Sequence, residues 1–409
     1  MSDLRRPAGK VIAALLGGTV GAAIVFAVGD FTTPGPRRQV PNVARMPATA
    51  PELIEDRLEP ESIVLLAWTP GSLPVRAEDR VERIPGVDQA TTLVAGLDWI
   101  AGSSTSHGGL IGQPPPGFKI PFETVVIEPQ EYASFVAPGE RDAIAALRQG
   151  EALLSRTSAE LRGGDRLSLA LQGPGERFLR SVRTVGVVSD EAAQGYEALL
   201  AGPVPATWER ADRFILVRVG RLSVRSTIER TLRSMLGGAE PIRVRAYGET
   251  PFLRYGDAVL PQMIIKEAFG EFAARPMLGG SIEIDPQWRQ ENIATSQLPL
   301  IGRATCHRFL LPQLRQALRA VRSAGAADKI DPGQFAGCYN ARFIARDPAG
   351  RLSHHSWGIA VDFNALENPS GANPRLDREV VDILERHGFT WGGRWLVPDG
   401  MHFEWVRFP

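Results

Sequence analysis

Residues that could hold a metal ion gather near the C-terminus. Five of the six histidines lie in the last quarter of the 409-residue chain, at His307, His354, His355, His387 and His402. The run Ser353-His-His-Ser-Trp-Gly-Ile-Ala-Val-Asp362 is followed later by Asp399-Gly-Met-His402. Where thiolates are absent, imidazole and carboxylate groups are the natural zinc ligands, and a catalytic zinc ion takes three of them and keeps a fourth position open. His355, Asp362 and His402 provide such a set.

The residues around Asp362 predict a compensating positive charge. Small and apolar residues alternate over 358–363, as suits a buried strand. A buried carboxylate is costly unless its charge is compensated, and a bound cation is one such partner. In a strand, His354 would point to the face opposite His355, so we treat His354 as a non-ligand.

The pattern Ser-x-His-x-x-Gly-x-Ala-x-Asp, with a later acid-x-x-His, resembles the VanY/D-alanyl-D-alanine carboxypeptidase group of zinc peptidases, which belongs to the LAS superfamily of cell-wall peptidases. The resemblance covers residues 280–409. It implies that His355, Asp362 and His402 bind one zinc ion per chain, and that Asp399 is the general base toward the water that zinc activates. Many members have Glu at this position, and Asp also occurs in the endopeptidase branch, although the reach of Asp399 is shorter.

The same resemblance implies that Arg342 presents its guanidinium to the scissile carbonyl, with a purely structural arginine as the alternative. Glu404 would share a strand face with His402, and we assign it the role of accepting the second N–H of His402. A rival general base and a surface salt bridge are the other interpretations of Glu404. Ser353 would form a hydrogen bond near the metal or fix a turn.

Cys306 and Cys338 are the only cysteines, which excludes a disulfide-rich scaffold and a zinc site built on cysteine pairs. In an oxidising compartment, a disulfide between them would close a loop of about 32 residues and contribute about 3 kcal/mol. A catalytic nucleophile formed by Cys306 and His307 is the alternative, but we discount it because the side chains of adjacent residues rarely point toward each other. Trp357, Trp391 and Trp395 are assigned to the core, with a wall of the substrate cleft as the alternative.

The elements that must position these residues are of mixed type, so the predicted fold class is α+β. Apolar residues at helical spacing predict helices over 309–321 and 376–387, the second ending at Gly388. Upstream, apolar runs predict buried strands over 62–68 and 213–219, and a helix covers 227–236. A small antiparallel sheet is expected in the C-terminal domain.

Residues 1–30 read as a cytoplasmic flank and a membrane anchor. Basic residues precede an uncharged run over 11–28, which as a helix would span about 27 Å, close to the hydrocarbon thickness of a bilayer. A cleavable signal peptide is the alternative, although its apolar region is usually shorter. Both interpretations place the remaining chain outside the cytoplasm. Residues 31–57, rich in Pro, Arg and Thr, are predicted to be a linker.

Residues 58–275 contain no cluster of chemistry-bearing side chains. The segments Val81-Glu-Arg-Ile-Pro-Gly-Val87, Gly150-Glu-Ala-Leu-Leu-Ser155 and Gly163-Gly-Asp-Arg-Leu-Ser-Leu169 resemble, in this order, the periplasmic core domain of MacB/FtsX-type ABC permeases. A permease has several membrane spans where this chain has one predicted span. The resemblance therefore implies a binding or positioning module that contacts a membrane-protein partner.

The composition limits the remaining classes. With 46 basic and 46 acidic residues and 44% hydrophobic residues, the chain is neither disordered nor a nucleic-acid binder that relies on bulk charge. We expect a membrane-anchored, extracytoplasmic zinc metallopeptidase acting on peptidoglycan stem peptides, as a D-Ala-D-Ala carboxypeptidase or a stem-peptide endopeptidase. The alternative is a non-catalytic scaffold that binds the cell wall and docks an ABC-permease-type partner through residues 58–275.

Overall fold

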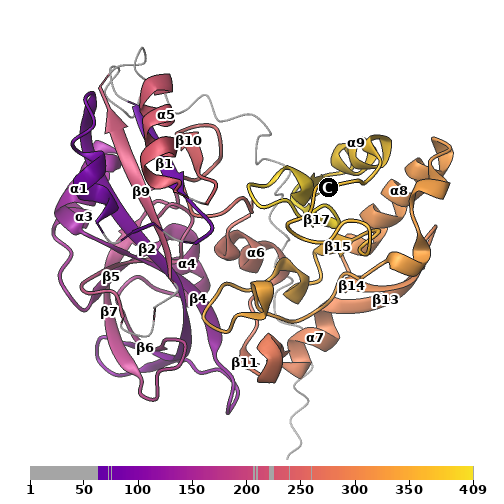
Figure 1. Cartoon of the computed structure of the whole chain (residues 1–409). Helices are drawn as coiled ribbons and strands as arrows, with labels where there is room; N and C mark the ends of the chain where they lie inside the picture. The colour runs from indigo at the N-terminus through magenta and orange to yellow at the C-terminus, as the bar shows by residue number, and fades with distance from the viewer. Residues whose placement is uncertain are drawn as a thin grey trace, which may run out of the picture. The chain divides into compact units, whose positions relative to one another are not determined.

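The structure is a computed structural model that describes residues 63–408, except residues 72, 75, 206–207, 209–210, 221–224, 239 and 259. The predicted anchor over 1–30 and the predicted linker over 31–57 lie outside the described residues. Within the described ranges, no helix is both long and apolar enough to cross a membrane. Helices and strands are mixed along the chain, which confirms the predicted α+β class (Figure 1).

A ten-stranded sheet dominates the middle region, drawn in indigo to magenta in Figure 1. Its strand order is β10-β1-β9-β2-β4-β8-β5-β7-β6, and β3 pairs with β2 outside this path. The strands are β1 (Ile63–Trp68), β2 (Val87–Thr105), β3 (Leu110–Gly112), β4 (Ile120–Ile127), β5 (Glu151–Ser155), β6 (Leu167–Gln172), β7 (Arg180–Val188), β8 (Ala198–Ala201), β9 (Asp212–Val219) and β10 (Arg243–Ala246). The strands predicted over 62–68 and 213–219 correspond to β1 and β9.

Six of these strands close into a ring, because β6 pairs with β2 as well as with β7. Strand β2 has 19 residues and pairs in turn with β9, β4 and β6. In β6, the buried Leu167, Leu169 and Leu171 alternate with partly exposed residues, as expected for a strand with one face in a core. These leucines share one apolar core with Phe122 and Leu154.

Short helices cover the rest of the sheet. Ile228 and Leu232 of α5 (Arg225–Leu236) and Val81 of α1 (Ala77–Val81) share a core with β1, β9 and β10. A separate core joins other residues of β1 and β9 with α2 (Pro129–Tyr132) and α3 (Pro138–Ala145). Helix α4 (Arg156–Arg162) follows β5 directly. The predicted helix over 227–236 is thus present and ends at the predicted residue.

The C-terminal part combines helices with three small sheets. Its helices are α6 (Gln262–Phe269), α7 (Pro286–Asn292), α8 (Leu310–Ser323) and α9 (Arg378–Arg386). Strands β11 (Ala274–Pro276) and β12 (Ile282–Ile284) form one hairpin, and β13 (Ile293–Leu298) and β14 (Gly302–His307) form another. The third sheet has the order β15 (Ala360–Asp362), β17 (His402–Trp405) and β16 (Phe389–Trp391). All its pairings are antiparallel, so the expected small sheet is present.

The core of the C-terminal part begins upstream of residue 280. The ring of Phe272 packs 4.6 Å from that of Trp357, between ring centroids. Leu97 and Trp99 of β2 belong to the same apolar core, and Trp99 makes an edge contact with Phe343. This core supports the segment that carries the candidate ligand His355.

Candidate metal centre

His355 lies in a single 3-10 turn, η9 (His354–Ser356), and the prediction that it lies in a strand is wrong. The hydroxyl of Ser353 caps this turn by accepting a hydrogen bond from the backbone N–H of His355, at 3.4 Å. The turn is followed by Gly358, whose φ of +70° is left-handed, and a Cβ there would lie 2.7 Å from the backbone nitrogen of His307. Only glycine fits such a conformation and contact without strain. The glycine of the motif thus lets the turn approach β14.

Asp362 and His402 come from adjacent strands. They are direct partners in the antiparallel pairing of β15 with β17, so their side chains leave the sheet on the same face. The backbone N–H of His402 donates to the carbonyl oxygen of Asp399 at 3.2 Å, which closes a turn. That turn explains the acid-x-x-His spacing, because it brings both ends of the motif to one place.

Ligand atoms of His355, Asp362 and His402 all lie within 4.8 Å of one another. Nε2 of His355 is 3.0 Å from Oδ2 of Asp362, and Nδ1 of His402 is 2.9 Å from Oδ1 of the same carboxylate. The two ring nitrogens are 3.2 Å apart. All three side chains are buried. The structure therefore brings together the three residues predicted to bind the metal.

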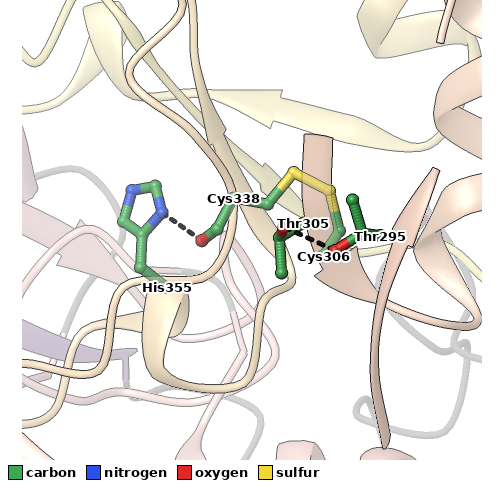
Figure 2. The surroundings of a disulfide bond; sticks show 5 residues. All are labelled: Thr295, Thr305, Cys306, Cys338 and His355. Atoms are coloured by element: carbon green, nitrogen blue, oxygen red, sulfur yellow. Dashed lines mark hydrogen bonds between the residues drawn. A yellow bond between two sulfur atoms is a disulfide. The ribbon is translucent and has the colours of Figure 1, made fainter. Parts of the chain in front are cut away.

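The second nitrogen of each imidazole has an oxygen partner. Nδ1 of His355 donates to the carbonyl oxygen of Cys338 at 2.7 Å (Figure 2). Nε2 of His402 lies 3.5 Å from Oε1 of Glu404. A carbonyl oxygen only accepts, so the proton of neutral His355 is on Nδ1, and its lone pair is on Nε2. This arrangement is the one that metal-binding histidines generally show, and it fits a divalent cation such as zinc.

The electrostatics of the centre rest on coupled charges. Burial acts to raise the pKa of Asp362, but the neighbouring His355 and His402 hold it well below its usual range. Burial acts in the opposite direction on His402, yet Asp362 and Glu404 raise its pKa to about 10. Asp362 and Glu404 thus favour a positive charge at His402. A cation bound at these atoms would supply the same compensation to the buried carboxylates.

Asp399 and Arg342 lie at the edge of the same cluster. Burial raises the pKa of Asp399, and the charges of His402, Asp362, His355 and Arg342 act on it. Oδ1 of Asp399 is buried and has no hydrogen-bond partner in the described part of the chain. Burial lowers the pKa of Arg342, which in turn interacts with Asp362 and Asp399. The charges of both residues thus interact with those of the cluster, and the Arg342 guanidinium also donates to the carbonyl oxygen of Phe343 at 3.3 Å.

Two further residues adjoin the cluster. Nδ1 of His354 lies 2.9 Å from Oε1 of Glu404. His354 thus contacts Glu404 and is not one of the three residues whose ligand atoms converge. The ring of Trp395 packs 5.3 Å from that of His402, although we assigned this tryptophan to the core. No local pattern distinguishes it from Trp357 and Trp391, which are buried.

The remaining histidines lie away from the cluster. His307 is fully buried, and its ring contacts those of Phe269 and Phe309. Burial lowers its pKa to about 4. Nδ1 of His387 donates to the carbonyl oxygen of Ile383 at the end of α9. Neither histidine is among the candidate ligands.

Cys306 and Cys338 are joined by a disulfide (Figure 2). Cys306 is in β14, and Cys338 is the residue whose carbonyl accepts from His355. Because the sulfur of Cys306 is bonded to that of Cys338, a nucleophile formed by Cys306 and His307 is excluded. Both cysteines are also buried.

Comparison with known families agrees with the C-terminal motif. Residues 346–405 match the family model described as D-alanyl-D-alanine carboxypeptidase. The matched segment contains His355, Asp362, Asp399 and His402, whereas Arg342 precedes it. The predicted resemblance to this family is confirmed for these residues. No curated protein matches the chain.

Two solved structures are similar to the chain. One is the periplasmic region of MacB from Actinobacillus actinomycetemcomitans, with 11% identity and a TM-score of 0.29, covering 44% of this chain and 87% of that one. The other is a domain of a putative permease protein from Porphyromonas gingivalis, with 17% identity and a TM-score of 0.28, covering 50% of this chain and 95% of that one. Their names are those of MacB and of a permease, the kinds of protein that the middle-region motifs resemble.

Proposed function

We propose that this protein is an extracytoplasmic zinc-dependent peptidase that hydrolyses peptidoglycan stem peptides. The observation that carries the proposal is the convergence of His355, Asp362 and His402, whose charges interact with that of Asp399, a residue with an unpartnered Oδ1. The family match over residues 346–405 supports the class of substrate.

His355, Asp362 and His402 would hold the zinc ion through two nitrogens and one carboxylate. Bound zinc would supply Lewis-acid chemistry, which polarises a carbonyl and acidifies water. The chain's own contribution is to fix both imidazoles in the required tautomers, through the carbonyl of Cys338 and the carboxylate of Glu404.

Asp399 is the proposed general base. A carboxylate whose pKa is raised binds a proton more readily near neutral pH, and Oδ1 of Asp399 has no competing hydrogen bond. Asp399 would accept a proton from the attacking water and pass it to the departing amine. Glu404 is the poorer base, because His354 and His402 hold its pKa well below its usual range despite its burial.

Arg342 is the proposed partner of the developing oxyanion. Its backbone is fixed by Ser356, whose hydroxyl accepts from the N–H of Arg342 and donates to its carbonyl, both at 3.1 Å. A cation held in a partly buried site stabilises negative charge more strongly than one in bulk water. Arg342 would thus act on the substrate while Asp399 acts on the proton.

The test is digestion of purified muropeptides by the full chain, with and without zinc, followed by mass spectrometry. We expect cleavage by the zinc-loaded wild type and its loss in Asp399→Ala with metal binding intact. Asp328→Ala, a change at an exposed carboxylate, is the control and should cleave like the wild type. Loss of one terminal D-alanine identifies a carboxypeptidase, and fragments cut within the stem identify an endopeptidase.

Two outcomes contradict the proposal. A wild-type chain that binds no zinc refutes the metal centre. A chain that binds zinc but leaves muropeptides intact refutes the substrate and favours either another peptide or the non-catalytic scaffold that binds the cell wall. Asp399 has one oxygen without a hydrogen-bond partner and a charge that interacts with those of the three ligands, which argues for catalysis over the scaffold.

Residues 58–275 are proposed to position the peptidase and to dock a membrane protein, such as an ABC-permease-type partner. Positioning is supported by Arg351, which precedes His355 by four residues. Its Nε lies 3.0 Å from Oδ2 of Asp212 in β9. For docking, Leu110 of β3 and Phe178 of the connection between β6 and β7 are exposed apolar side chains. A photo-crosslinker at Phe178 should capture one membrane protein in native membranes, whereas a crosslinker at Leu366 should not.

The localisation is proposed to be the cell membrane, with the described residues on the extracytoplasmic side. The Cys306–Cys338 disulfide supports an oxidising compartment. The anchor over residues 1–30 remains a proposal, tested by whether the mature protein keeps these residues and sediments with membranes.

A further inference from the structure

A five-residue segment, 336–340, lies between the β13–β14 hairpin and the candidate metal ligands. It belongs to no helix or strand. On the hairpin side, the disulfide joins Cys338 to Cys306 of β14, and the N–H of Tyr339 donates to the carbonyl of Thr305 at 2.9 Å. In the described part of the chain, this is the segment's one backbone hydrogen bond to β14. The disulfide is therefore the main link between the segment and the hairpin.

On its other side, the same segment contacts two of the three candidate ligands. The carbonyl of Cys338 accepts from Nδ1 of His355 at 2.7 Å, and the N–H of Asn340 donates to the carbonyl of His355 at 3.0 Å. The backbone of Asp362 forms two hydrogen bonds with the segment. Its carbonyl accepts from the N–H of Ala336 at 3.1 Å, and its N–H donates to the carbonyl of Gly337 at 3.2 Å. The segment thus fixes the side chain of His355 and the backbone of both ligands.

The hairpin behind the disulfide is a firm support. Strands β13 and β14 pair over six consecutive residue pairs, and the hydroxyls of Thr295 and Thr305 form a further hydrogen bond at 2.8 Å (Figure 2). Cys306 is fully buried in the same apolar core as Leu314 and Val321 of α8. A covalent bond to this support restricts the movement of Cys338 more than a single backbone hydrogen bond would.

We propose that the Cys306–Cys338 disulfide is a positioning element of the metal centre, which fixes the carbonyl that orients His355. The proposal rests on the proposed function, because the residues it positions are the candidate zinc ligands. Loss of a partner that orients a metal-binding histidine typically lowers metal affinity 10- to 100-fold. A disulfide that only stabilised the fold would leave the affinity of the folded protein unchanged.

The metal centre is then complete only in the oxidised chain. Reduction by a dithiol transfers two electrons and two protons to the disulfide, which leaves thiols at Cys306 and Cys338 and converts the dithiol to its own disulfide. A chain that has not yet left a reducing compartment would bind zinc weakly. Hydrolase activity would then follow export and oxidation.

The test compares zinc affinity, by competition with a chromophoric chelator, for full chains of the wild type, Cys306→Ser/Cys338→Ser and Val321→Ala. The last variant is a control, because it truncates the same core and leaves the disulfide intact. We expect affinity 10- to 100-fold below wild type for the double variant and within about threefold for Val321→Ala. Wild-type affinity in a folded double variant overturns the proposal. If Cys306→Ser/Cys338→Ser does not fold, the double variant Cys306→Ala/Cys338→Val is used instead, because its side chains are apolar like the surrounding core.

Hydrogen exchange of the metal-free chain separates this proposal from the proposed function. The amide of Asp362 donates to the segment, and that of Asn340 belongs to it. Both amides should exchange faster in the double variant, while the amides of the β13–β14 pairing stay protected. Unchanged protection at Asp362 and Asn340 overturns the positioning role. Failure of the wild type to bind zinc refutes the proposed function, and the exchange result then still decides whether the disulfide positions these residues.

Discussion

Asp362 lies directly opposite His402 in the pairing of β15 with β17, and its Oδ1 is 2.9 Å from Nδ1 of the histidine. Two of the three candidate ligands are therefore fixed by the register of one small sheet. A shift of one residue would send one of the two side chains to the other face, and the ligand set would be lost. The third ligand, His355, depends on a turn and on the 336–340 segment.

Replacement of Glu404 by Gln should weaken zinc binding. The change removes the carboxylate that lies between Nε2 of His402 and Nδ1 of His354. We expect the zinc affinity to fall about 10- to 100-fold, measured by chelator competition. Glu385→Gln, at a partly exposed carboxylate of α9 paired with Arg394, is the matched control. Equal affinities in the two variants would contradict the role assigned to Glu404.

Replacement of Arg342 by Ala should impair turnover and leave the metal in place. Loss of one group that stabilises the oxyanion typically lowers kcat about 100- to 1,000-fold. We expect Lys at this position to recover part of the rate, because it keeps the charge. Arg346→Ala is the control, since this exposed arginine contacts the carbonyl of Gly279 instead. A kcat for Arg342→Ala close to that of the control would assign Arg342 a purely structural role.

The buried ion pair of α6 should dominate the stability of this region. Nζ of Lys266 lies 2.8 Å from Glu197 and 3.0 Å from Glu271, and both Lys266 and Glu197 are almost fully buried. Lys266→Met should lower the free energy of unfolding by about 3–5 kcal/mol, since it leaves the Glu197 charge uncompensated.

Urea unfolding followed by tryptophan fluorescence measures this loss. The double variant Lys266→Met/Glu197→Gln should recover part of it, because the unpaired charge is gone. Lys329→Met, at an exposed pair with Asp328, should change the free energy by less than about 0.5 kcal/mol. A loss of less than about 1 kcal/mol for Lys266→Met would contradict the prediction that Lys266 compensates a buried Glu197 charge.

Glu131 should make stability depend on pH. Burial, together with the neighbouring Glu78, raises its pKa to about 7. A raised carboxyl pKa means that the folded chain holds the proton more tightly than the unfolded chain. The stabilising contribution is therefore complete below about pH 4.5 and is lost as the pH rises through about 7.

Glu131→Gln removes this titration and should match the wild type near pH 4 but exceed its urea midpoint at pH 8. Glu291→Gln, at an exposed carboxylate of α7, should show no such divergence. Parallel midpoints for wild type and Glu131→Gln from pH 4 to 8 would contradict the raised pKa.

Local patterns were sufficient for part of this structure. The strand β1 and the helices α5, α8 and α9 follow from apolar spacing, because each buries one face against a neighbour. The motif spacing was enough to select the three residues whose ligand atoms meet. The turn at His354 was missed, since the Ser353 cap and the left-handed Gly358 interrupt what reads as a continuous strand.

Contacts between distant segments could not be predicted from such patterns. The closure of the ring by β2 and β6 depends on strands far apart in the chain, and neither sequence carries a mark of its partner. The same holds for Arg351 beside Asp212 and for His354 beside Glu404. Tertiary packing decides these pairs, because many arginines and acids would satisfy the local rules equally well.

Strand β2 contributes Leu97 and Trp99 to the core that also contains Trp357 and Phe343. One strand thus belongs both to the ten-stranded sheet and to the support of the metal centre. Unfolding of the sheet would remove Leu97 and Trp99 from this core. Heat should therefore unfold the sheet and the metal centre together in a single cooperative transition. For the same reason, proteolytic clipping near residue 280 would not release a self-sufficient hydrolase.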